Sequence, residues 1–216
     1  RLVGSEMCIR DRYISIAIAC ASCRPCPPEL QAGDLLFQAG SGSDMTEAID
    51  CATRSDNNLT FTHVGIFTPD RDTDCVLEAT SEGGVKITPM QEFLDRAARI
   101  DGQPAVVAMR LRDTTGTAQA LERARERLGL PYDYSFRPDN GKLYCSELVW
   151  ECYRRLDGSP RFPARPMNFR APDGSMPAFW TELFERLGEQ IPEGVPGTNP
   201  NDMARDPQLD EVGRWF

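Results

Sequence analysis

The sequence predicts a single domain in which helices and short strands are mixed, and three observations support this. The chain has 216 residues, which is enough for one domain of ordinary size with at most a long appendage. Hydrophobic residues make up 40% of it and charged residues 26%, so it can bury a core. Short apolar runs with strand character alternate with segments whose apolar residues recur at helical spacing.

Turn residues and helix caps indicate where these elements begin. Gly33 opens a turn into a short buried strand, Asp44 can cap a helix, and the apolar run from Phe61 is a strong strand candidate. Thr88 and Pro89 open the next helix, because proline suits the first helical turn. The expected strands are 33–37, 61–67, 75–80, 85–87 and 105–111, and the expected helices are 44–53, 90–98, 117–128 and 144–156.

The helix expected at 144–156 carries its apolar residues on one face, and Gly158 ends it. These apolar residues are Leu148, Val149, Cys152 and Leu156. The face predicts that the helix packs against the rest of the domain.

The composition divides the chain into three parts. Residues 1–29 are expected to be a prefix, an export signal and a linker, and residues 30–158 are expected to form the main domain. Residues 159–216 hold nine of the seventeen prolines, and only 178–187 looks helical there. This proline-rich extension is expected to wrap over the same domain, since it is poorly suited to fold alone.

The first residues predict export. Residues 1–12 resemble translated sequencing-adapter read-through, which indicates a non-native prefix. Arg10 and Arg12 precede an apolar stretch at 13–21, which is the layout of a secretory signal. Small residues before Cys23 resemble the end of a bacterial lipoprotein signal, so Cys23 is the expected site of lipidation and membrane attachment. We therefore expect an exported protein, either periplasmic or anchored in the envelope.

Export would place the remaining cysteines in an oxidising compartment. Cys51 and Cys75 could then form a disulfide, although the sequence alone does not fix the connectivity. Cys152 lies two helical turns beyond Cys145 and is expected to pack in the core as a small hydrophobe.

Charge and composition exclude several classes of function. The chain has 24 basic and 33 acidic residues, a net charge of −9 and a pI near 4.8, so it lacks the basic surface that nucleic-acid binding requires. No apolar run reaches the roughly 18 to 20 residues of a membrane-spanning helix. One histidine and scattered acids give no recognisable metal-ligand spacing, so neither a metal nor another cofactor is expected.

The chain has a single histidine, so any mechanism that needs an imidazole must use His63. If Phe67 and Asp74 close a hairpin, His63 lies directly opposite Glu78 on the same face. Apolar residues flank Glu78, and a carboxylate in such surroundings normally has a partner. A carboxylate beside an imidazole fixes its tautomer and stabilises the imidazolium. The alternative is that His63 is an ordinary core or surface histidine.

Cys145 lies in the first turn of an expected helix. The positive end of the helix dipole lowers the pKa of a thiol there, and the free amides can stabilise an oxyanion. The alternative role of a structural thiol suits Cys152 better, because Cys152 lies on the apolar face. Together Cys145, His63 and Glu78 fit the pattern of a cysteine nucleophile, a histidine base and an orienting acid.

Six segments of the chain resemble a known family of cysteine hydrolases. They are Gly33-Asp-Leu-Leu-Phe37, Thr62-His-Val-Gly-Ile66, Val76-Leu-Glu-Ala-Thr80, Gly83-Gly-Val85, Leu128-Gly-Leu-Pro-Tyr-Asp133 and Tyr144-Cys-Ser-Glu-Leu148. The pattern, over roughly residues 30–156, is similar to the YiiX/YebB type of NlpC-like cysteine hydrolase. In these circularly permuted papain-fold proteins the histidine and its acid precede the cysteine, which is the order seen here. Residues 191–200 also resemble the C-terminal stretch of the family.

The resemblance implies an α+β fold, a circularly permuted papain-like (NlpC-type) domain. Its antiparallel sheet or small barrel would pack against the cysteine-bearing helix. The resemblance also implies that Cys145 is the nucleophile, His63 the general base and then acid, and Glu78 the orienting residue. Tyr132 lies in a loop that would line the cleft and is an expected substrate contact. Tyr144 is a second such candidate, unless it belongs to the core.

We therefore expect a thiol hydrolase that cleaves an amide bond through a thioester intermediate, with a small peptide or a peptidoglycan fragment as substrate. Relatives in the wider family cut cell-wall peptides, whereas other permuted members move acyl groups on lipids, and membership does not decide between them. A lipid-directed thioesterase, phospholipase or acyltransferase with the same triad stays open, although the chain offers no basic amphipathic helix. A non-catalytic binding lipoprotein is the third hypothesis.

Overall fold

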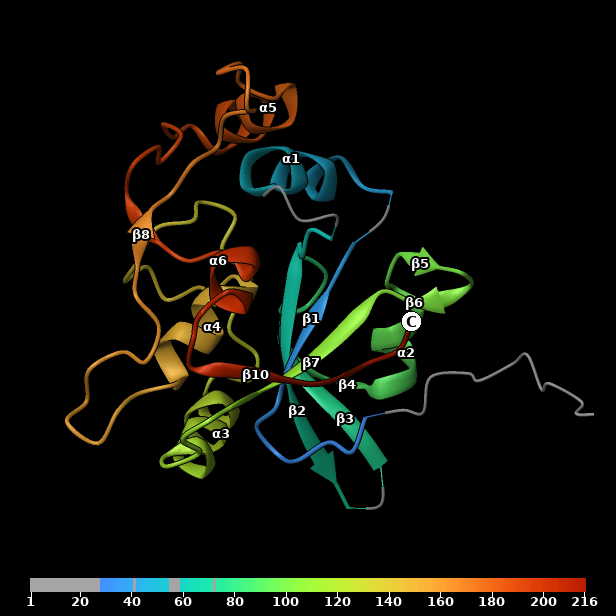
Figure 1. Cartoon of the computed structure of the whole chain (residues 1–216). Helices are drawn as coiled ribbons and strands as arrows, with labels where there is room; N and C mark the ends of the chain where they lie inside the picture. Colours follow the sequence, from blue (N-terminus) through green and yellow to red (C-terminus); the bar gives the residue numbers. More distant parts are fainter. Residues whose placement is uncertain (1–27, 41, 55–58, 72) are drawn as a thin grey trace, which may run out of the picture.

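An open sheet of six strands, all paired antiparallel, is the framework of the fold (Figure 1). The computed structural model describes residues 28–216 except 41, 55–58 and 72. The strand order is β10-β7-β1-β2-β3-β4, so β10 and β4 form the two edges. The expected α+β class and antiparallel sheet are confirmed, and the described residues form no closed barrel. The expected prefix, signal and lipidation site fall in residues 1–27, outside the described part.

The elements follow one another closely along the chain. The sheet consists of β1 (Leu35–Gln38), β2 (His63–Asp70), β3 (Thr73–Thr80), β4 (Gly84–Pro89), β7 (Val106–Leu111) and β10 (Leu209–Arg214). Two small ribbons pair β5 (Arg99–Ile100) with β6 (Gln103–Pro104) and β8 (Arg165–Pro166) with β9 (Pro196–Gly197). The helices are α1 (Asp44–Thr53), α2 (Met90–Asp95), α3 (Thr117–Glu126), α4 (Cys145–Cys152), α5 (Ala178–Leu187) and α6 (Pro200–Ala204).

Successive residues of the central strands face two different cores. On one face, Val64 and Ile66 of β2 pack in a cluster with residues of α3 and α4. On the other face, Phe67 packs with Val76 and with Phe93 of α2. Because side chains alternate along a strand, the buried central strands need apolar residues at nearly every position, as the sequence shows.

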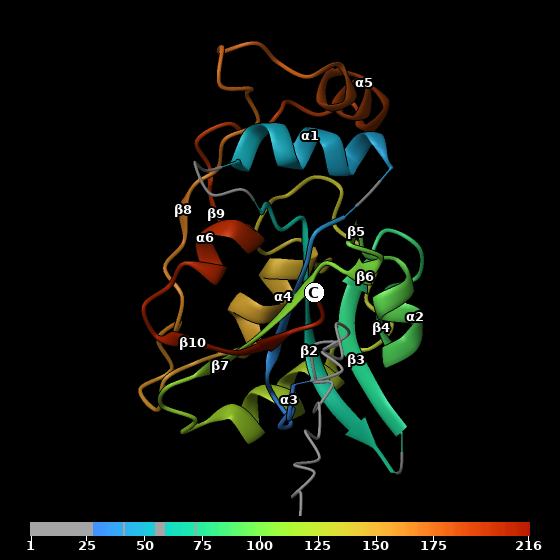
Figure 2. The same ribbon diagram turned by 45° about the vertical axis from the view of Figure 1, so that its right-hand side comes forward.

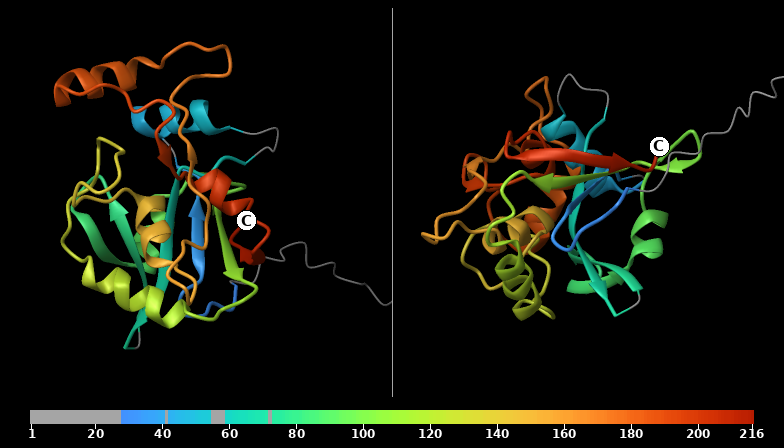
Figure 3. Two further views of the ribbon diagram at one scale, coloured as in Figure 1. Left: turned by 90° about the vertical axis from the view of Figure 1, so that its left-hand side faces the viewer. Right: turned by 60° about the horizontal axis from the view of Figure 1, so that its bottom comes forward.

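The C-terminal segment after α4 runs along the molecule to α5, which packs on α1 beyond one end of the sheet (Figures 2 and 3). It then returns as α6 and enters the sheet as β10, paired with β7. The expectation that only 178–187 is helical in this segment is wrong, because α6 is a second helix. Edge strand β10 buries only Leu209 fully, so its sequence is too polar to be recognised as a strand.

The cysteine-bearing helix is shorter than its apolar pattern predicts. It ends at Cys152 because Tyr153 leaves helical geometry and is buried, where its hydroxyl donates a hydrogen bond of 2.7 Å to the carbonyl of Gly33. Leu156, expected on the apolar face, lies beyond the helix end and is 86% exposed. Its place in that face is wrong, since periodicity does not show where a helix stops.

The four cysteines in the described residues are free thiols. The disulfide considered for Cys51 and Cys75 is wrong, because Cys51 lies in α1 beyond one end of the sheet and Cys75 lies near the hairpin at the other end (Figure 1). Cys152 is fully buried in the core, as expected. Within the residues described, no helix has the length and apolar character needed to cross a membrane.

Candidate active site

The three residues expected to carry the chemistry lie at the end of the sheet nearest α1. His63 is the first residue of β2, and Glu78 lies near the end of β3, which runs antiparallel to β2. Cys145 is the first residue of α4, which packs against both strands. The chain thus brings a histidine, a carboxylate and a thiol together from separate segments.

The hairpin between β2 and β3 does not have the expected register. The structure pairs Phe67 with Val76 and extends the ladder to Asp70, which pairs with Thr73. His63 is therefore not directly opposite Glu78. The slip is an even number of residues, so both side chains stay on the same face, and Glu78 reaches His63 diagonally. Nε2 of His63 donates a hydrogen bond of 2.6 Å to Oε2 of Glu78.

Gly65 makes this diagonal contact possible. A Cβ at Gly65 would lie 2.3 Å from Cγ1 of Val76 and 3.3 Å from Cε2 of Phe93, with Cβ of Glu78 at 3.5 Å. Only glycine leaves this surface free of a side chain between the histidine and the carboxylate. The glycine two residues after the histidine thus has a steric role in the site.

Replacing Gly65 with alanine is expected to lower both stability and activity. The added methyl group overpacks Val76, at a cost of about 1 to 3 kcal/mol in the free energy of unfolding, and moves Glu78 away from His63. Thermal unfolding and kcat/KM measure the two effects. Thr73→Ala, at the exposed start of β3, is the control that leaves both close to wild type. A Gly65→Ala protein that equals wild type in both would contradict this steric role.

The carboxylate of Glu78 is fully buried and has three partners. Besides His63, its Oε1 accepts hydrogen bonds from the hydroxyl of Thr88, at 2.6 Å, and from the guanidinium of Arg96. Burial favours the neutral acid, but the hydrogen bond and charge of His63, with the charge of Arg96 and the hydrogen bond of Thr88, lower the pKa of Glu78 to about 2. The carboxylate therefore remains ionised at neutral pH.

His63 lies between the carboxylate and the thiol. Its side chain is 17% exposed. Burial opposes its charge, but hydrogen bonds with Cys145 and Glu78 and the charges of both groups raise the pKa of His63 to about 10. Nε2 is bonded to Glu78, so Nδ1 is the nitrogen that remains for the thiol. The geometry favours an imidazolium beside Cys145 at neutral pH.

The thiol of Cys145 lies at the amino end of α4. The amides of Cys145 and Ser146 are in the first turn, where a helix offers no acceptor for them. They can therefore donate to an oxyanion that forms close to the sulfur. His63 and Glu78 thus lie on one side of the sulfur, and the amide donors of the first helical turn lie next to it.

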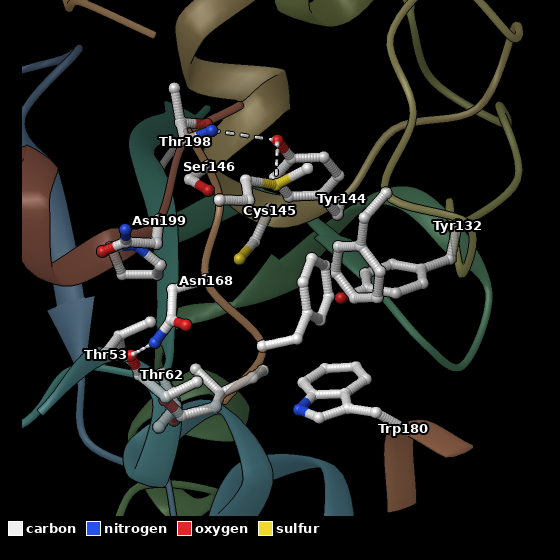
Figure 4. A pocket seen from close by; sticks show the side chains of 16 residues that line it. Thr53, Thr62, Tyr132, Tyr144, Cys145, Ser146, Asn168, Trp180, Thr198 and Asn199 are labelled. Carbon is white, nitrogen blue, oxygen red and sulfur yellow. Dashed lines mark hydrogen bonds between the residues drawn. The ribbon is translucent and has the colours of Figure 1, made fainter. Parts of the chain in front are cut away.

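Two hollows flank the pair of Cys145 and His63. An apolar cavity of about 60 Å³ opens beside Cys145 (Figure 4), and a more polar hollow of about 190 Å³ lies beside His63 and Arg96. Tyr132, one of the two expected substrate contacts, lines both hollows, and Tyr144 lines the apolar cavity. Both tyrosines are thus positioned to contact a bound molecule.

Tyr144 also has a structural position in the site. It precedes α4, and its hydroxyl accepts a hydrogen bond of 3.1 Å from the amide of Thr198. Its ring packs in a cluster with Phe136 and Trp180. Tyr144 thereby connects the start of the cysteine helix to the C-terminal segment.

Sequence reasoning missed Thr88 and Arg96, which hold the carboxylate, and the residues of the C-terminal segment that line the apolar cavity. A buried glutamate signals that partners exist, but the sequence does not say which residues they are. From the C-terminal segment the lining residues are Met167, Asn168, Phe169, Trp180, Thr198, Asn199 and Pro200.

Known proteins are similar to this chain over most of its length. The family model described as "permuted papain-like amidase enzyme, YaeF/YiiX, C92 family" matches residues 29–213. The chain is 30% identical over 185 residues to the uncharacterized protein YiiX of Escherichia coli K12, covering 85% of this chain and 86% of that protein.

A solved structure, described as the metalloprotein yiiX from Escherichia coli O157:H7, has the same fold. It aligns with a TM-score of 0.68 and 29% sequence identity, covering 85% of this chain and 97% of the other. In the part of this chain that the structure describes, no group of three or more His, Cys, Asp or Glu side chains could hold a metal ion. The described donor groups therefore do not fit a metal site.

Proposed function

Because the chain belongs to the permuted papain-like amidase family of the YaeF/YiiX type, we propose that Cys145, His63 and Glu78 form a catalytic triad that hydrolyses an amide bond. This family, peptidase family C92, denotes enzymes of the cysteine peptidase or amidase type, and the chain is an enzyme of this type. One observation carries the proposal: His63 is hydrogen-bonded to the buried Glu78, and Cys145 begins the helix α4 that packs against the two strands bearing these residues.

The first half of the proposed reaction forms a thioester. The thiolate of Cys145, paired with protonated His63, attacks the amide carbonyl carbon, and the first-turn amides stabilise the oxyanion. His63 then gives its proton to the amide nitrogen, the C–N bond breaks and the amine leaves. Glu78 holds the imidazole in place and stabilises its charge.

Water completes the cycle. His63, now neutral, takes a proton from a water molecule, and the resulting hydroxide attacks the thioester carbon. The C–S bond breaks, the carboxylic acid leaves, and the thiolate and imidazolium are restored. No cofactor is needed for either half of the reaction.

We propose a small peptide, including one derived from peptidoglycan, as the source of the amide. The net charge of −9 supports this, because an acidic protein attracts substrates that bear amines.

The direct test is to trap the thioester. The protein is mixed with muropeptides, quenched in acid within milliseconds to seconds, and analysed by mass spectrometry of its peptides. We expect an acyl group on the peptide that contains Cys145 and none on the peptide that contains Cys51, which is also a free and partly exposed thiol. Hydrolysis without any adduct on Cys145, in a protein whose Cys145→Ala variant is equally active, rejects the proposal.

A further inference from the structure

The cavity beside Cys145 has apolar walls, and some of its lining residues carry polar atoms without a partner in the described part of the chain. Its walls include Ile49, Met167 and Phe169, and the sulfur of Cys145 lies at one end (Figure 4). Trp180, from α5, lies at the opposite end of the view. The inference made here about the ligand of this cavity goes beyond the proposed function and rests on it.

Three of the residues that line the cavity each have a buried side-chain atom that lacks a hydrogen-bond partner among the described residues. They are Oγ of Ser146, Nε1 of Trp180 and Oγ1 of Thr198. Ser146 is fully buried and Trp180 is 2% exposed. A buried polar group left unpaired costs about 1 to 3 kcal/mol, so three of them around one cavity indicate that a ligand supplies the missing partners.

The chemistry of the reaction decides which half of the substrate enters this cavity. His63 must give a proton to the leaving nitrogen, so the leaving amine lies on the imidazole side, beside the polar hollow. The acyl half then lies on the other side of the sulfur, where the apolar cavity opens. The cavity is thus positioned to receive the acyl group that becomes the thioester.

The size of the cavity limits that acyl group. Its volume is about 60 Å³. A protein cavity of about 150 Å³ accommodates benzene, with its six carbons, so on this scale the cavity holds about two or three non-hydrogen atoms beyond the carbonyl. A long fatty acyl chain exceeds this space.

The unpaired atoms define the polarity of the acyl group. The indole nitrogen of Trp180 can only donate a hydrogen bond, whereas the hydroxyls of Ser146 and Thr198 can donate and accept. An oxygen on the acyl group satisfies the donor, and a hydroxyl also satisfies an acceptor. We propose that the enzyme selects amides of short acyl groups, of about two or three non-hydrogen atoms beyond the carbonyl, that carry a hydrogen-bonding oxygen.

The test uses four coumarin amides that differ only in the acyl group: propionyl, 2-hydroxypropionyl, 3-hydroxypropionyl and octanoyl. We expect kcat/KM to be about 3- to 10-fold higher for the better hydroxypropionyl amide than for the propionyl amide, the worth of one hydrogen bond. We expect octanoyl to be at least about tenfold poorer than propionyl, because it overfills the cavity. Equal or faster turnover of octanoyl amide overturns the inference.

A pair of tryptophan variants makes the test specific. Trp180→Phe keeps a large ring but removes the N–H, and we expect the preference for the hydroxyl to disappear. Trp150→Phe is the matched control, because the nitrogen of Trp150 is also buried and unpaired among the described residues but does not line the cavity. We expect this variant to keep the preference. Loss of the preference in both variants, or in neither, contradicts the assignment to Trp180.

A binding measurement separates this inference from the proposed function. In the Cys145→Ala protein, 3-hydroxypropanamide is expected to shift the indole N–H resonance of Trp180, which is identified by its absence in a Trp180→Phe variant. If no amide is turned over but the resonance shifts, the proposed function fails and the cavity assignment stands. If amides are hydrolysed through Cys145 without selectivity and without the shift, the cavity assignment fails and the function stands.

Discussion

Replacing Cys145 with alanine is expected to lower amide hydrolysis by at least about 10⁴-fold. Among the described cysteines, Cys145 is the one whose thiol interacts with His63, and without this thiol no thioester forms. The loss is as large as removal of a nucleophile from other triads, where the residual rate comes from binding and oxyanion donors alone. Progress curves with the best amide substrate measure the loss of rate, and a higher protein concentration makes the residual activity of the variant detectable.

Cys152→Ala is the matched control for this variant. Cys152 belongs to the same helix, but it is fully buried, and burial raises the pKa of its thiol to about 12. We expect a rate close to wild type and a loss of about 1 to 2 kcal/mol in stability from the small cavity left behind. Two results would rule out Cys145 as the nucleophile. One is a Cys145→Ala protein that keeps a tenth of the wild-type rate, and the other is a folded Cys152→Ala protein that has lost its activity.

Replacing Glu78 with glutamine is expected to lower kcat by about 10⁴-fold, the loss that the same replacement of the orienting carboxylate causes in a serine protease triad. The amide keeps the size of the side chain but removes the charge that stabilises the imidazolium of His63. It also leaves the guanidinium of Arg96 without its carboxylate partner. Loss of one member of a buried ion pair destabilises the protein as well, so activity must be measured on protein shown to be folded.

The pH dependence distinguishes this role from a purely structural one. The pKa of His63, about 10, is raised in part by the hydrogen bond and charge of Glu78, and its ordinary value is 6.5. Without the carboxylate the imidazolium loses its proton at lower pH, so the alkaline limb of the kcat/KM profile moves down by at least about one pH unit. An unchanged limb in a folded, slower variant would show that Glu78 does not act through His63.

Thr88→Val is the control for the carboxylate. The valine keeps the shape of the buried threonine but removes a single hydrogen bond to Oε1 of Glu78, while the carboxylate and its charge remain. We expect a loss of activity of no more than about tenfold and a smaller movement of the alkaline limb.

Stability should depend on pH at both ends of the scale for the same reason. The pKa of Glu78 is lowered from 4.5 to about 2, so its contribution to stability is present above pH 4.5 and is lost as the pH falls through 2. The pKa of His63 is raised, so its contribution is full below pH 6.5 and is lost as the pH rises through 10. The pair therefore stabilises the fold most between these two windows.

The sequence was sufficient to predict the elements that bear the chemistry. A single histidine, an acid among apolar residues and a cysteine at a helix start are local signals, and each can be recognised without knowledge of contacts. The register of the hairpin was not predictable in the same way, because the two-residue slip of β2 against β3 leaves the faces of His63 and Glu78 unchanged. The partners of Glu78 also depend on contacts, since Arg96 lies just beyond α2 and comes to the carboxylate only when that helix packs on the sheet.

The C-terminal segment was the least predictable part for a similar reason. Trp180 lies in the stretch recognised as helical and Thr198 in the stretch that resembles the C-terminal end of the family, but neither pattern indicates which side chains reach the cavity. Their places in the cavity follow from the packing of α5 on α1 and from the hydrogen bond between Thr198 and Tyr144. Such long-range contacts leave no periodic pattern in the sequence.

The pairing of β10 with β7 has a consequence for how the protein folds. Strand β10 (Leu209–Arg214) pairs with β7 (Val106–Leu111), although about a hundred residues separate the two strands along the chain. Because closing so long a loop costs entropy before the contact forms, we expect this edge of the sheet to be completed late in folding. The walls that α5 and Thr198 supply to the cavity lie within the same loop, so we expect the cavity beside Cys145 to be completed at the same late step.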